Sequence, residues 1–87
     1  KLTICPAAEG YGYKFKRTDL EGEPEIEAIA TRVSFTQRGT VLAGDNGETI
    51  STIEHLLSAL RALRVDNCCI ELDGLEVPIL DENISVC

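Results

Sequence analysis

The amino-acid sequence predicts an α+β domain with two layers, in which one main helix packs on a sheet of mostly antiparallel strands. Short segments that alternate apolar and polar residues, as half-buried strands do, occupy the first half of the chain. A single stretch with apolar residues at helical spacing follows, and an apolar strand comes after it. At 87 residues, the chain has room for one small domain built around this helix.

Turn-forming residues separate the expected strands. Tyr13-Lys14-Phe15-Lys16 shows the strand pattern most clearly, because aromatic and basic side chains alternate. A loop is expected at residues 19–24 from their composition, and a tight turn at residues 44–47, since Asn-Gly accepts the positive φ of such turns. We expect strands at residues 2–5, 13–16, 25–29, 32–36, 40–43 and 68–72, and a short extended piece at residues 76–80.

The main helix is expected at about residues 52–64. Its apolar stripe consists of Ile53, Leu56, Leu57, Leu60 and Leu63. The sequence from Ser51 to Glu54 fits a capping box, with Ser51 as the N-cap and Glu54 as its reciprocal partner. The opposite face carries His55 together with the small residues Ser58, Ala59 and Ala62. Small residues let another backbone or a ligand approach closely, so we expect the helix to lie between two layers.

The charge of the chain argues against two classes of partner. The formal net charge is −7, from 15 acidic and 8 basic residues, and acidic pairs such as Asp19 with Glu21 are interpreted as solvated loop charges. Binding to nucleic acid or to an anionic membrane surface depends on many basic side chains, so neither is expected. No apolar run approaches the about 20 residues that a spanning helix needs, and no signal peptide opens the chain. We expect a cytoplasmic protein.

The four cysteines are expected to be reduced. Cys68 and Cys69 are adjacent in an apolar strand, so their side chains point to opposite faces. Cys5 and Cys87 lie near the two ends of the sequence, and no C-x-x-C pair suggests a thiolate zinc site. Buried thiols of a cytoplasmic protein are therefore favoured over a disulfide scaffold.

Glu54 and His55 are the residues best suited to chemistry, and each also has a structural explanation. His55 is the only histidine; it either packs as a structural residue or binds a metal as a neutral imidazole, the form favoured at the positive end of a helix dipole. Glu54 either completes the capping box or acts as a general base. A hydrolytic zinc site needs three protein ligands, which one histidine cannot supply. The residues alone leave both choices open.

Several motifs, taken together, resemble one enzyme family. In chain order the motifs are Cys5-Pro6-Ala7, Gly12-Tyr13-Lys14, Arg17-Thr18-Asp19-Leu20, Arg38-Gly39-Thr40-Val41-Leu42, Ile50-Ser51-Thr52-Ile53-Glu54-His55-Leu56, Ala59-Leu60, Val65-Asp66-Asn67 and Glu76-Val77-Pro78-Ile79-Leu80-Asp81. Together they are similar to the first domain of UDP-3-O-acyl-N-acetylglucosamine deacetylases, which catalyse the committed step of lipid A synthesis in Gram-negative bacteria. The resemblance covers nearly the whole chain.

The resemblance implies a zinc-dependent hydrolase that removes the N-acetyl group from an acylated UDP-glucosamine. It implies that His55 is a Zn²⁺ ligand and that Glu54 is the general base that activates the zinc-bound water. In the family, the other ligands are a histidine and an aspartate from an HKxxD segment of a second domain, and this sequence has no such segment. We therefore expect residues 1–87 to form an incomplete N-terminal domain that is inactive alone, partnered by a second domain of the same polypeptide.

The end of the chain departs from the family pattern. The family reads Asp-Gly-Ser-Ala after its Pro-Ile-Leu segment, whereas here Asp81 is followed by Glu-Asn-Ile-Ser-Val-Cys. The alternative to an enzyme is a non-catalytic acidic α+β binding module with the same fold. A second domain with an HKxxD segment beyond Cys87 favours the enzyme, whereas a stop codon soon after Cys87 favours the module.

Overall fold

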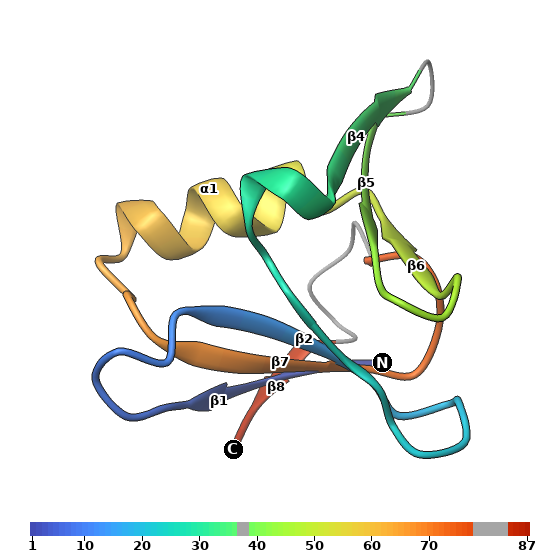
Figure 1. The fold of residues 1–87 in the computed structure, drawn as a ribbon. Helices are drawn as coiled ribbons and strands as arrows, with labels where there is room; N and C mark the ends of the chain where they lie inside the picture. Colours follow the sequence, from blue (N-terminus) through green and yellow to red (C-terminus); the bar gives the residue numbers. More distant parts are fainter. Residues whose placement is uncertain (37–38, 78–83) are drawn as a thin grey trace.

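The computed structural model describes residues 1–36, 39–77 and 84–87, which form two sheets, one α-helix and one short 3-10 helix (Figure 1). The helical elements are α1 (Glu54–Ala62) and the 3-10 helix η1 (Ala30–Arg32). The strands are β1 (Leu2–Pro6), β2 (Tyr13–Arg17), β3 (Glu25–Glu27), β4 (Val33–Thr36), β5 (Gly39–Ala43), β6 (Thr49–Ser51), β7 (Cys68–Leu72) and β8 (Ile84–Val86).

Antiparallel pairing predominates in the two sheets, as predicted. The larger sheet has the strand order β3-β2-β7-β1-β8, and the smaller one the order β4-β5-β6. In the larger sheet, β7 is antiparallel to β1 and parallel to β2, and β8 is parallel to β1. Both pairings of the smaller sheet are antiparallel. Figure 1 shows α1 lying across one face of the larger sheet, so the predicted helix-on-sheet α+β fold is confirmed.

The core fills the space between α1 and the larger sheet. Along β7 the buried residues Cys68, Ile70 and Leu72 alternate with partly exposed ones, because successive side chains of a strand point to opposite faces. Phe15 of β2 and Leu60 of α1 belong to the same cluster. Leu60 is the buried residue of α1, and the partly buried Leu56 and Leu57 pack against the same core. Burying an aliphatic side chain fully contributes about 1.5–3 kcal/mol, so these leucines hold the helix on the sheet.

The predicted capping box is wrong. Ser51 lies in β6, a strand that the sequence analysis did not predict, and α1 begins only at Glu54. Thr52 has a φ of 63°, which turns the chain between β6 and α1. The N-cap position is occupied by Ile53, which makes no side-chain hydrogen bond to the helix. Ser51 instead donates from its backbone N–H (2.8 Å) and its hydroxyl (3.2 Å) to the carbonyl oxygen of Leu75. The hydrogen bonds of Ser51 to Leu75 therefore take the place of the predicted bond from Ser51 to the helix.

The face of α1 that carries His55 is not covered by the described parts of the chain. Ser58, Ala59 and Ala62 are exposed together with His55. The expectation of a helix between two layers is therefore wrong for residues 1–36, 39–77 and 84–87, in which the larger sheet covers only the opposite face. The extended piece predicted at residues 76–80 lies outside the described residues after Val77, and Glu76 forms a parallel bridge with Ser51.

The prediction of four reduced cysteines is wrong for two of them. Cys5 and Cys87 form a disulfide, and Cys68 and Cys69 are free. The partners are 82 residues apart in sequence, but β8 runs parallel to β1 with Val86 opposite Ile4, which brings the two Cα atoms to 5.1 Å. This distance suits a disulfide, and only the sheet pairing creates it.

A separate expectation concerned membrane-spanning segments. Among the residues that the structure describes, no helix has both the length and the apolar character needed to cross a bilayer.

Candidate functional site

Glu54 and His55 form the first turn of α1, beside the hairpin of β4 and β5 (Figure 1). Two fully buried isoleucines, Ile50 and Ile53, precede them and anchor the segment in the core. Thr52 is also fixed, because its backbone N–H donates to the carbonyl oxygen of Thr40 at 3.0 Å. The backbone that carries the two candidate residues is therefore held by the core and by β5.

The carboxylate of Glu54 is directed at the start of β5. Its Oε2 atom accepts a hydrogen bond from the backbone N–H of Thr40 at 3.2 Å. A Cβ atom placed on Gly39 would lie 3.3 Å from Oε1, so the approach of the carboxylate to the strand is close. Hydrogen bonds from its own backbone N–H and from Thr40 lower the pKa of Glu54, against the opposing effect of burial. Glu54 is thus a carboxylate at neutral pH and can accept a proton.

His55 lies on the exposed side of the same helical turn. Within the part of the chain that the structure describes, its imidazole makes no hydrogen bond or ion pair, so either ring nitrogen is free to bind a metal. The described residues contain no group of three or more His, Cys, Asp or Glu side chains that could hold a metal ion. A zinc site therefore fits this surface only if further ligands come from outside these residues.

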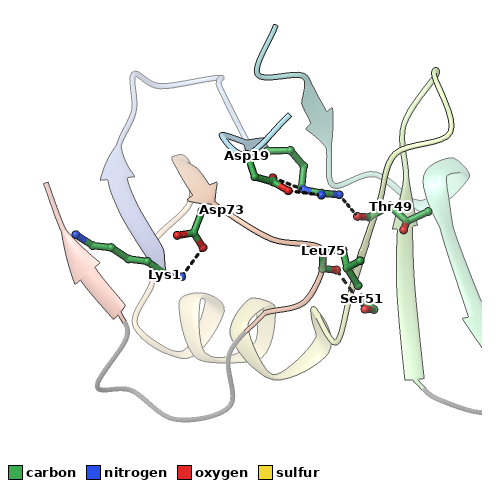
Figure 2. Close-up of polar contacts among 7 residues, drawn as sticks. Lys1, Asp19, Thr49, Ser51, Asp73 and Leu75 are labelled. Atoms are coloured by element: carbon green, nitrogen blue, oxygen red, sulfur yellow. Dashed lines mark hydrogen bonds and ion pairs between the residues drawn. The ribbon is translucent and has the colours of Figure 1, made fainter. Parts of the chain in front are cut away.

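Arg17 was named in the sequence analysis only as part of a motif, without a role of its own. Its guanidinium is buried at the end of β2 and binds the carboxylate of Asp19 through two nitrogens, at 2.8 Å and 2.7 Å. Its third nitrogen donates to the carbonyl oxygen of Thr49 in β6 at 2.8 Å, as Figure 2 shows. Asp19 is an exposed loop residue, as interpreted from the sequence, but it is paired with Arg17, and the hydrogen bond to Arg17 lowers its pKa. The alternation of β2 could have indicated this, since residue 17 shares the face of Phe15.

A small cavity lies further along α1. Its volume is about 240 Å³, and it is lined by Tyr13, Ala28, Leu57, Ser58 and Arg61. Neither Glu54 nor His55 contributes to its walls. It is therefore separate from the candidate site.

Comparison with known proteins matches the chain to one family. The family model described as LpxC, UDP-3-O-acyl N-acetylglycosamine deacetylase, matches residues 1–84. The bifunctional enzyme LpxC/FabZ of Porphyromonas gingivalis is 60% identical over 81 residues, and that of Bacteroides thetaiotaomicron is 52% identical over 80 residues. Each match covers 92% of this chain and 17% of the relative.

A third relative carries the deacetylase name alone. The UDP-3-O-acyl-N-acetylglucosamine deacetylase of Shewanella halifaxensis is 49% identical over 84 residues, which are 97% of this chain and 28% of that protein. The chain thus spans between 17% and 28% of the length of these relatives.

Proposed function

This chain belongs to the UDP-3-O-acyl N-acetylglycosamine deacetylase family, and we propose that the protein of which it forms part is a zinc-dependent hydrolase. The substrate is UDP-3-O-acyl-N-acetylglucosamine, which loses its N-acetyl group in the committed step of lipid A synthesis in the cytoplasm of a Gram-negative bacterium. The observation that carries the proposal is the family match over residues 1–84, which includes Glu54 and His55 side by side on the first turn of α1.

Residues beyond this chain are required to complete the site. A zinc ion, when bound, supplies Lewis-acid polarisation of the amide carbonyl and lowers the pKa of a water molecule towards about 7. His55 would hold it through its exposed imidazole, with the other ligands on a second domain of the same polypeptide. The three relatives are long enough to contain a second domain, since the chain covers 28% or less of each of them. The 87 residues alone are therefore inactive.

Glu54 is the proposed general base. The loss of the capping box removes the structural explanation that its sequence position offered, because Ser51 is bound to Leu75 instead. Its carboxylate is oriented by the backbone N–H of Thr40, which donates to Oε2. A carboxylate held beside a metal ligand is suited to take a proton from the attacking water.

Replacing Glu54 with glutamine in the full-length protein tests this role. The amide keeps the shape of the side chain and can still accept from Thr40, but it cannot take a proton. The Glu54→Gln protein should fold, retain zinc and lose roughly 100-fold or more in turnover. His55→Ala should instead reduce the bound zinc, measured by atomic absorption.

Glu48→Gln is the matched control. Glu48 also accepts a hydrogen bond from a backbone N–H, that of Asn46 at 3.1 Å, but it lies in the turn between β5 and β6. Its turnover should equal that of the wild type. Near-normal turnover by Glu54→Gln would mean that the base lies elsewhere, and a wild-type protein without turnover would favour the non-catalytic binding module.

A further inference from the structure

Arg17 is the one charged side chain in the core formed by residues 1–36, 39–77 and 84–87, with 6% of its surface exposed. A buried charge is costly unless it is paired and fully hydrogen-bonded. The guanidinium is paired with Asp19, and each of its three nitrogens has a hydrogen-bond partner in Asp19 or in the carbonyl oxygen of Thr49. Asp19 is two residues from Arg17 in the sequence, whereas Thr49 lies in β6 of the smaller sheet.

The contact with Thr49 joins the larger sheet to β6. On one side β6 pairs with β5, with Thr49 opposite Ala43 and Ser51 opposite Val41. On its other side, Arg17 holds the first residue of β6, and Leu75, just after β7, accepts two hydrogen bonds from the last residue. Figure 2 shows these two attachments at the two ends of the strand.

The strand held in this way leads directly into the candidate site. Only Thr52 and Ile53 separate the end of β6 from Glu54. A shift of Thr49 relative to the larger sheet is therefore expected to reach the first turn of α1 through a short link that turns at Thr52. Leu75 holds Ser51 at the end of β6, and Arg17 holds Thr49 at its start.

We propose that Arg17 is a positioning residue for Glu54 and His55, which acts by fixing the carbonyl oxygen of Thr49 and hence β6. The role in turnover rests on the proposed function, whereas the effect on the backbone does not. Asp19 orients the guanidinium through a two-point ion pair, which leaves the third nitrogen aimed at Thr49. A lysine cannot reproduce this, since its ammonium group lacks the planar fork.

Arg17→Lys in the full-length protein tests the proposal with two readouts. The first is steady-state kinetics per mole of bound zinc, well below the melting temperature. We expect kcat to fall about tenfold with KM little changed, since a misplacement of about 1 Å can cost roughly 100-fold. The second is hydrogen exchange, in which the backbone N–H groups of residues 51–55 should exchange faster than in the wild type. A merely structural role lowers the melting temperature but changes neither readout for the folded enzyme.

Arg32→Lys is the control, because Arg32 also pairs with an aspartate and donates to a backbone carbonyl oxygen, but it is only partly buried. It binds Asp45 at 2.7 Å and the carbonyl oxygen of Ala43 at 3.5 Å, at the opposite end of β5 from Thr40. Its variant should retain the wild-type kcat and the wild-type exchange at residues 51–55. If Arg17→Lys does not fold, Asp19→Asn carries the same test, since it keeps the guanidinium but removes the charge that orients it.

The outcomes separate this proposal from the proposed function. Unchanged kcat and unchanged exchange in Arg17→Lys would overturn the positioning role. If the wild-type protein has no deacetylase activity, the proposed function fails. In that case, faster exchange at residues 51–55 in Arg17→Lys but not in Arg32→Lys still supports the positioning role of Arg17. Equal exchange in all variants rejects the positioning role.

Discussion

Replacing Phe15 with leucine is expected to lower the free energy of unfolding of the chain by about 2 kcal/mol. Phe15 is fully buried in β2, where it lies opposite Ile26 of β3 and Ile70 of β7, both also buried. Leucine removes the outer part of the ring, at about 0.8 kcal/mol for each buried carbon group, and the neighbouring strands cannot close the space fully.

The measurement is urea denaturation of the 87-residue chain, followed by circular dichroism. A loss of about 2 kcal/mol moves the denaturation midpoint by about 1 M or more if the slope is about 1–2 kcal/mol per M. Thermal unfolding should show a melting temperature lower by about 10 °C, since 1 kcal/mol corresponds to roughly 4–8 °C in a domain of this size.

Phe35→Leu is the matched control, because the chain has only two phenylalanines and both lie in strands. Phe35, in β4, is 85% exposed, so the same change should alter the free energy of unfolding by less than about 0.5 kcal/mol. Equal losses in the two variants, or a loss below about 0.5 kcal/mol for Phe15→Leu, would refute the core described here.

Three further predictions concern the metal, the cysteines and the ion pair. The 87-residue chain should bind zinc weakly in calorimetric titration, because the described residues bring no three ligands together; tight stoichiometric binding would contradict a site shared with another domain. Alkylation of the unfolded, unreduced chain should label two cysteines, Cys68 and Cys69, by mass spectrometry, and four labels would restore the reduced state predicted from the sequence. Because Arg17 lowers the pKa of Asp19, the pair stabilises the fold above the ordinary carboxyl pKa of about 4, and this contribution is lost as the pH falls through the lower folded-state pKa. The stability advantage of the wild type over Asp19→Asn should therefore shrink in urea titrations below about pH 4, whereas a constant difference would reject this linkage.

The fold was predictable where local periodicity and burial agree. β2, β7 and most of the apolar stripe follow from apolar spacing, and burying Ile53 and Leu60 packs α1 on the sheet. Leu63 was wrongly placed in the stripe, because α1 ends at Ala62 and Leu63 is 74% exposed. The start of the helix was not predictable in this way. Ser51 had a favourable local partner in the capping box, but hydrogen bonds to Leu75, 24 residues away, replaced it.

The candidate site was also predictable only where it depends on residues that are neighbours in the sequence. Glu54 and His55 are covalent neighbours, so the sequence alone places them side by side, whereas the tertiary structure decides that α1 begins at Glu54. The orientation of Glu54 depends on Thr40, 14 residues earlier, which no local pattern indicates.

The sequence by itself determined the apolar periodicity, the main helix and the adjacency of Glu54 and His55, because these depend on residues within a few positions of one another. Tertiary structure alone decided the pairs that act at a distance. Arg17 reaches Thr49 across 32 residues, and Cys5 meets Cys87 across 82. Such partners are chosen by sheet order and register, which arise from the packing of the whole domain rather than from any one segment.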